Sequence, residues 1–147
     1  ILHPSSFILH CSLFILLLPS AFTASQSAFP IGGDHGSYDG IDQIAATLQS
    51  APADSVLYYY WLSWQWRFYL FYSQLYVAWM PDTDAIQKDL KTFGKKSPRY
   101  IVAPSWVSFS ETQTAIESAN FKVEKIQTTT RRDGSPSFTL YKIISNP

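Results

Sequence analysis

The glycine-rich segment 32–36 holds the residues whose types are best suited to chemistry. Asp34 and His35 offer one edge of a metal site, but no second histidine or carboxylate pair follows at ligand spacing. The sequence also lacks Gly-x-Ser-x-Gly, the turn that presents a serine nucleophile in hydrolases. Any general-base scheme would rest on His35 alone, because the two other histidines belong to an N-terminal repeat. We therefore assign no catalytic residue, no metal ligand and no cofactor, and leave open whether the chain is an enzyme.

Two segments superficially suggest an anion site. Segment 32–36 is rich in glycine, but it precedes the first expected strand, whereas phosphate-binding loops join a strand to a helix. A flexible turn is therefore favoured. Arg131 and Arg132 form a short basic stretch before Asp133-Gly134. There a solvated hairpin tip is favoured over a phosphate contact.

Aromatic residues are concentrated between positions 58 and 72. Tyr and Trp combine an apolar ring with a polar group, which suits a membrane–water interface as well as a sugar-stacking surface. A crowded aromatic core is the third interpretation, and the favoured one. If the segment is helical, Trp66 and Tyr69 lie off the face shared by Trp61, Trp64, Phe68 and Tyr72. The candidate contacts to a membrane interface or a sugar are Trp61, Trp64, Trp66, Tyr69 and Tyr72.

Composition excludes several classes of function. The chain has 147 residues, of which 46% are hydrophobic, enough for one domain with a substantial core. Lys and Arg number 11, as do Asp and Glu, and this balance argues against a nucleic-acid partner. The single cysteine, Cys11, excludes an intrachain disulfide framework.

The first 33 residues carry no Asp, Glu, Lys or Arg. A seven-residue motif occurs at 1–7 and again at 8–14, with a degenerate copy at 15–22. A membrane helix would be short and interrupted by His10, Ser12 and Pro19, and a signal peptide would lack its basic start. A remnant of the last membrane helix of a longer protein and a translated repetitive DNA tract are the other interpretations, and the near-identical copies favour the last. Because the sequence begins with Ile1, we expect a fragment, a processed product or a reading frame with an unusual start.

Helical and strand-like patterns alternate through the rest of the chain. This alternation predicts a small three-layer α/β sandwich with a mainly parallel sheet. Asp133-Gly134 between two strand-like segments predicts a C-terminal antiparallel hairpin. We place a hydrophobic leader, disordered or membrane-derived, at 1–31 and an α/β accessory domain at 32–147. Helices are expected at 40–50, 61–72, 81–94 and from 110, and strands at 56–60, 75–79, 99–103, 121–129 and 137–144.

Three segments together resemble a known family. Segments 33–42, 64–70 and 133–141 are similar to the C-terminal soluble domain of bacterial membrane glycosyltransferases of family 39, the aminoarabinose-transferase-like or protein-mannosyltransferase-like type. The resemblance implies a multi-spanning enzyme that uses a polyprenyl-phosphate sugar donor. In that family the catalytic acidic residue lies far upstream, so no position of this chain inherits it.

The resemblance implies a detached extramembrane accessory domain that is not catalytic alone. Its expected partners are the membrane or the remaining transmembrane part of the enzyme, with carbohydrate or lipid as further possibilities. The expected location is membrane-associated, on the extracytoplasmic side. The alternatives are a free-standing carbohydrate- or lipid-binding module and a non-functional gene fragment.

Overall fold

The computed structural model describes residues 4–26 and 35–146. The chain divides into two units, Ile1–Tyr38 and Asp39–Pro147. The described residues of the first unit include the helix α1 (Pro4–Ser25), with Pro19 inside it. Its side chains Phe14 and Phe22 are exposed. Across the described residues, no helix is both long enough and apolar enough for a membrane crossing.

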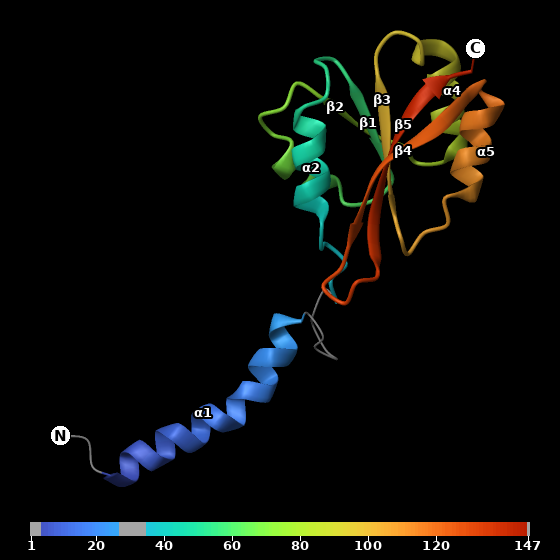
Figure 1. Cartoon of the computed structure of the whole chain (residues 1–147). Helices are drawn as coiled ribbons and strands as arrows, with labels where there is room; N and C mark the ends of the chain where they lie inside the picture. The colour runs from blue at the N-terminus through green and yellow to red at the C-terminus, as the bar shows by residue number, and fades with distance from the viewer. Residues whose placement is uncertain (1–3, 27–34, 147) are drawn as a thin grey trace. The chain divides into compact units, whose positions relative to one another are not determined.

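The second unit alternates helices and strands as the sequence pattern predicts (Figure 1). The predicted α/β fold with a C-terminal antiparallel hairpin is confirmed. The sheet, predicted to be mainly parallel, is mixed, with two parallel and two antiparallel pairings. Its elements are α2 (Ile41–Gln49), β1 (Val56–Tyr59), α3 (Ser63–Tyr69), β2 (Tyr76–Trp79), α4 (Thr83–Phe93), β3 (Arg99–Pro104), α5 (Ser110–Ser118), β4 (Phe121–Thr130) and β5 (Pro136–Ser145).

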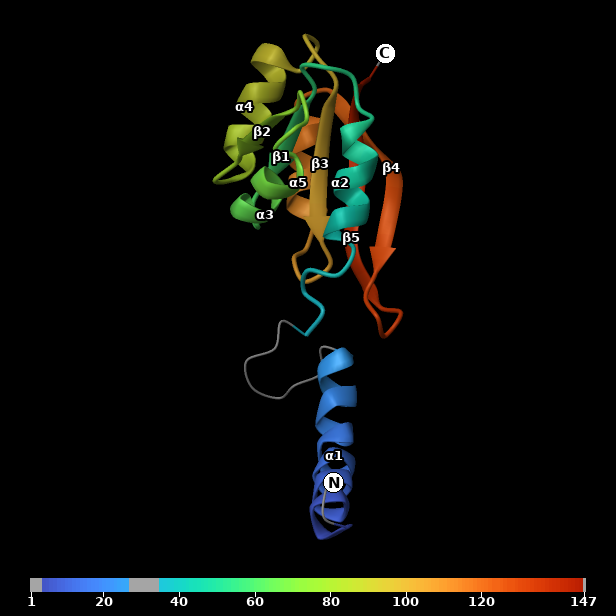
Figure 2. The same cartoon turned by 90° about the vertical axis from the view of Figure 1, so that its left-hand side faces the viewer.

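The strands form one sheet in the order β2-β1-β3-β5-β4. Strand β1 pairs in parallel with β2 and β3, whereas β5 pairs antiparallel with β3 and β4. The hairpin predicted around Asp133-Gly134 is therefore present. Its second strand, β5, lies between β3 and β4, so the first strand of the hairpin, β4, is the outer one. Strands β2 and β4 are consequently the two edges of the sheet, on opposite sides of β3 in Figure 2.

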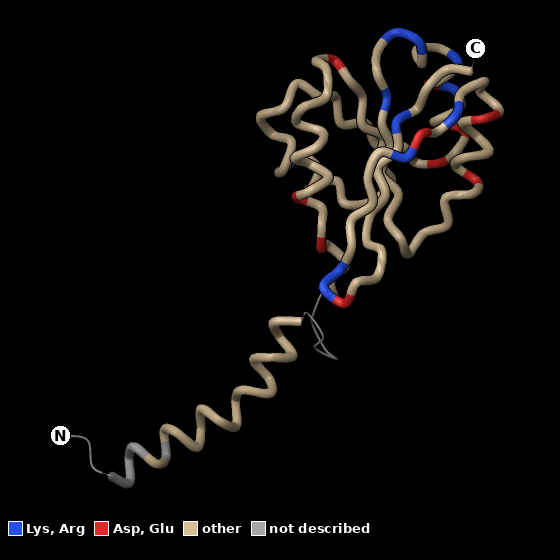
Figure 3. Tube along the Cα trace, in the orientation of Figure 1, with Lys and Arg blue, Asp and Glu red and all other residues tan. Residues whose placement is uncertain are grey.

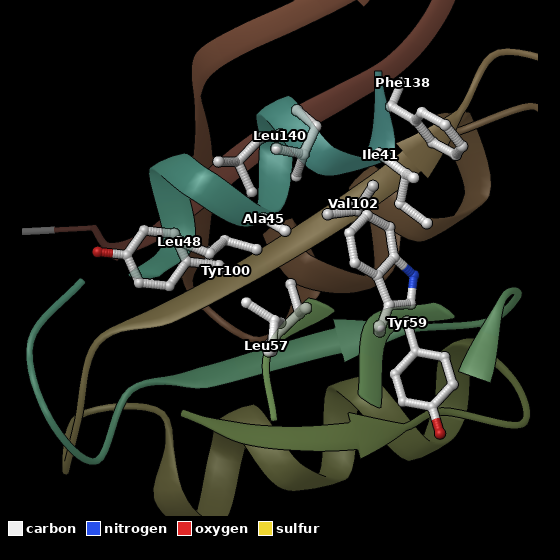
Figure 4. Packing of buried hydrophobic residues seen from close by; sticks show 12 residues of the cluster. Ile41, Ala45, Leu48, Leu57, Tyr59, Tyr100, Val102, Phe138 and Leu140 are labelled. Atoms are coloured by element: carbon white, nitrogen blue, oxygen red, sulfur yellow. The ribbon is translucent and has the colours of Figure 1, made fainter. Parts of the chain in front are cut away.

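Two apolar cores lie on the two faces of the sheet. On one face, α2 and α3 pack over β1, β3 and β5 (Figure 4). On the other, α4 and α5 pack over residues that include Tyr58, Ile101 and Ile143. The predicted apolar face of α2 is buried, with Ile44 and Leu48 almost fully enclosed. Because one tight core forms on each face, each helix has a defined position over the sheet.

The start of α2 differs from expectation. The sequence suggests that Ser37 or Asp39 caps this helix, but Gly40 is the N-cap residue and no side chain caps the helix. Asp39 is engaged elsewhere: its carboxylate accepts a hydrogen bond from the Arg132 backbone N–H at 3.1 Å, and its carbonyl accepts one from the Ser137 hydroxyl at 2.6 Å. The capping prediction is wrong because Asp39 ties the start of α2 to the β4–β5 hairpin.

Gly40 is expected to be intolerant of a side chain. Its φ is +84°, and a Cβ there would lie 2.5 Å from the buried Thr129 side chain. Gly40→Ala should lower the free energy of unfolding by about 2–3 kcal/mol, from left-handed backbone strain plus overpacking. Gly134→Ala is the matched control, because its φ is +83° but nothing lies within 4 Å of the added carbon. Equal losses in urea unfolding of the two variants would contradict the packing argument.

Candidate functional site

The most distinctive surface of the domain is aromatic. Within 61–79 every aromatic side chain except Trp66 is exposed, and Arg67 is the single charged residue. These side chains come from the connection between β1 and α3, from α3, from the turn after it and from the edge strand β2, which lies beside α3. The lysines, by contrast, lie in α4, the loop that follows it, β4 and β5; Figure 3 marks them in blue together with the arginines. We call this surface the aromatic edge; it comprises Trp61, Trp64, Phe68, Tyr69, Phe71, Tyr72, Tyr76 and Trp79.

The structure separates the five aromatic residues proposed from sequence. Trp64 and Tyr72 are 81% and 95% exposed, and Trp61 and Tyr69 also belong to the aromatic edge. Trp66 is only 1% exposed and packs edge-on against a core phenylalanine, so it cannot contact an external ligand in this fold. Contact of the other four with a membrane or a sugar stays a prediction. Sequence reasoning missed Tyr76 and Trp79, because a strand pattern alone does not show which strand forms an edge.

Buried side chains and hydrogen bonds anchor the backbone that carries the exposed rings. Trp66 anchors α3 to the core, and the Gln49 side chain donates a hydrogen bond to the Tyr69 carbonyl at 3.2 Å. Leu70, 4% exposed, anchors the turn that follows, where the Ser73 hydroxyl donates to the Leu70 carbonyl at 2.7 Å. The aromatic edge is therefore displayed on a fixed backbone.

A shallow groove of about 520 Å³ runs along β2. It receives Arg67 from α3 on one face of the sheet and Asp89 from α4 on the other, so it wraps around the edge of the strand. Its remaining lining residues are Val56, Tyr58, Tyr76, Val77, Ala78, Trp79, Met80 and Arg99. The groove leaves the outer side of β2 accessible.

The outer side of β2 presents unpaired backbone groups. Tyr76 and Met80 donate backbone hydrogen bonds to Ser55 and Tyr59, at 2.9 and 3.0 Å, so these residues face β1. Because successive residues of a strand direct their backbone groups to opposite sides, those of Val77 and Trp79 point away from β1. Among the described residues β2 pairs with β1 alone. Backbone donors and acceptors therefore lie within the aromatic edge.

A buried polar cluster forms the floor of the groove. The Arg99 side chain, 4% exposed, donates to the Tyr58 hydroxyl at 2.6 Å and lies 3.4 Å from an Asp89 carboxylate oxygen. The Tyr58 hydroxyl in turn donates to Asp89, and Arg99 also donates to the Ser97 carbonyl at 2.9 Å. Burial, followed by the hydrogen bond to Asp89, raises the pKa of Tyr58, so the phenol remains a donor at neutral pH. The cluster ties β1, β3 and α4 together beneath the groove.

This cluster was absent from the sequence interpretation. The sequence does contain a signal for such a cluster. Arg99 is the first residue of a strand whose following residues are apolar, and a charged side chain in that position needs a buried partner. Its partners lie 41 and 10 residues away along the chain. These separations match no known motif, so the sequence does not identify Tyr58 and Asp89 as the partners of Arg99.

Among the described residues, the remaining sequence candidates do not assemble into a site. Arg131 donates to the Ser105 hydroxyl at 2.9 Å, and Arg132 lies 4.0 Å from the Asp39 carboxylate, so both arginines contact segments outside the hairpin. Asp34 lies outside the described residues, whereas His35 lies within them. In the described parts of the chain, no three His, Cys, Asp or Glu side chains are grouped to hold a metal ion.

Comparison with known proteins yields little. No protein-family model matches this chain, and no curated protein matches it either. A solved structure of a release-factor-specific protein-(glutamine-N5) methyltransferase from Alicyclobacillus acidocaldarius is similar, with 10% identity and a TM-score of 0.43. The match covers 81% of this chain and 100% of that one. Likeness at this level assigns no activity to the present chain.

The predicted family is nevertheless corrected. The structural neighbour is a methyltransferase and not a glycosyltransferase domain, and no family model supports family 39. The interpretation as a detached glycosyltransferase accessory domain is therefore wrong. The alternatives, a free-standing carbohydrate- or lipid-binding module and a non-functional gene fragment, are not supported either. The reason is physical: the three matching segments consist of turn residues and aromatic residues, whose local preferences recur in unrelated folds.

Proposed function

We propose that this domain docks a protein partner through the aromatic edge. The observation that carries the proposal is the coincidence of exposed Trp, Tyr and Phe side chains with an unpaired edge strand. Protein interfaces are enriched in aromatic residues and arginine and depleted of lysine and acidic residues. Segment 61–79 has this composition, with Arg67 as its one charge.

The exposed backbone of β2 favours a protein over other partners. A second polypeptide strand satisfies the outward groups of Val77 and Trp79 through main-chain hydrogen bonds, while the flanking rings supply affinity and specificity. A membrane surface or a sugar offers no such matched row of donors and acceptors. Exposed apolar surface of this extent is also unusual on a protein that has no partner.

A peptide selection tests the docking function. Random twelve-residue peptides displayed on phage are panned against the full chain, and the tightest binder is titrated by NMR with isotope-labelled protein. We expect chemical-shift changes centred on α3 and β2. Phe68→Ser combined with Tyr72→Ser should weaken binding at least about tenfold, because exposed aromatic residues dominate interface energies. Ile126→Ser, on the opposite sheet edge, is the matched control and should leave binding unchanged.

Two further arms of the experiment address the non-protein partners expected from sequence. The same variants are tested for binding to phosphatidylcholine vesicles, with and without phosphatidylglycerol, and to cellohexaose. Vesicle or oligosaccharide binding that depends on the aromatic edge, without any peptide binding there, would overturn the proposal. So would shift changes confined to other surfaces of a chain that is monomeric at the concentration of the titration.

A further inference from the structure

The two edges of the sheet are built differently. Strand β4 carries Lys122 and Lys125 and contains register shifts between Lys125 and Gln127 and between Thr128 and Thr130. Edge lysines and bulges are devices that prevent a sheet edge from pairing with another strand. Strand β2 has neither: Tyr76-Val77-Ala78-Trp79 is uncharged and pairs with β1 without a shift in register.

We propose that the occupant of the aromatic edge is a second copy of this chain, joined by antiparallel pairing of β2 with the β2 strand of its partner. The inference rests on the proposed docking function and names the partner. A two-fold axis requires identical strands to pair antiparallel. Centred on Ala78, such pairing places Val77 opposite the partner's Trp79, and both residues have outward backbone groups that exchange hydrogen bonds.

The surface available is sufficient for a stable dimer. The side chains of the aromatic edge are between 37% and 95% exposed. With about 150–250 Å² per aromatic side chain, they expose on the order of 1,000 Å². A standard protein interface takes about 800 Å² from each partner. Covering the aromatic edge with a second copy removes most of this apolar area from water.

Charge does not oppose the pairing. The formal net charge of the chain is zero, so two copies experience no long-range repulsion. The groove along β2 contains one cation, Arg67, and one partly exposed carboxylate, Asp89, together with the buried Arg99. Two copies related by a two-fold axis therefore bring both signs of charge to the interface.

Analytical ultracentrifugation of the full chain tests the inference. We expect a concentration-dependent shift from 16.7 kDa to twice that mass. Trp79→Lys and, separately, Tyr76→Lys should raise the dimer dissociation constant at least about tenfold, because a lysine on each copy faces the same edge. Ile126→Lys places the same charge on the opposite edge and should leave the constant unchanged. Circular dichroism confirms that each variant is folded.

A cross-linking experiment fixes the register. In a Cys11→Ser background, which removes the exposed native thiol, Ala78→Cys should form a disulfide-linked dimer under oxidation. Residue 78 then faces its own copy at a Cα separation of about 4.5 Å, within the range a disulfide spans. Ile126→Cys in the same background is the matched control and should form no disulfide-linked dimer.

The outcomes separate this inference from the docking function. A monomer at all concentrations that still binds selected peptides at β2 overturns self-pairing and leaves docking intact. A dimer that is insensitive to Trp79→Lys and Tyr76→Lys, or equal cross-linking through residues 78 and 126, also overturns it. A monomer that binds no peptide at β2 overturns both.

Discussion

Trp66→Ala is expected to lower the free energy of unfolding by about 3–5 kcal/mol, the cost of deleting a large buried aromatic side chain. Trp66 is 1% exposed and its ring meets that of Phe138 edge-on, at a centroid distance of 6.0 Å. This loss is a large part of the free energy of unfolding of a small domain, which is about 5–15 kcal/mol. It should also detach α3, because Trp66 is the buried residue of that helix. Urea unfolding followed by far-ultraviolet circular dichroism measures the change.

Trp64→Ala is the matched control on the same helix. Trp64 is 81% exposed, so its removal should change the free energy of unfolding by no more than about 0.5 kcal/mol. The two tryptophans are two residues apart and were equally good candidates in the sequence. Similar losses for the two variants would mean that α3 is placed wrongly.

Asp89→Ala is expected to destabilise the domain by about 3–5 kcal/mol, because it leaves the buried Arg99 guanidinium without its carboxylate. Asp89 is 29% exposed, so water can partly replace the carboxylate, and the lower end of this range is expected. The Tyr58 hydroxyl loses its acceptor in the same variant. Thermal and urea unfolding of the purified chain measure the loss.

Asp89→Asn separates charge from hydrogen bonding. The amide oxygen still accepts the hydrogen bond from Tyr58 but provides no charge for Arg99, so an intermediate loss is expected. Asp84→Ala, at an exposed site of the same helix, should be close to neutral. If Asp89→Ala is as stable as Asp84→Ala, the cluster does not hold α4 to the sheet.

The regular elements could be predicted because their signals are local. Ile44 and Leu48 recur at helical spacing and form the buried face of α2. The strands of the hairpin flank Asp133-Gly134, and Gly134 has the positive φ that such a turn requires. The family resemblance was also built from local segments, and it was wrong.

The candidate site depended on contacts between distant segments. Tyr76 and Trp79 belong to the site because β2 lies at the edge of the sheet, and strand order has no local signature. Arg99 meets Tyr58 and Asp89 only after three separate elements pack together. Neither arrangement has a sequence spacing that could have revealed it.

The sequence by itself determined the alternation of helices and strands and the C-terminal hairpin. Those properties follow from side-chain periodicity and turn chemistry, which act over a few residues. Tertiary structure alone decided that Trp66 is buried while Trp64 is exposed, and that β2 is the unprotected edge. Both are set by which faces and edges the packed layers cover, and that is a property of the whole domain.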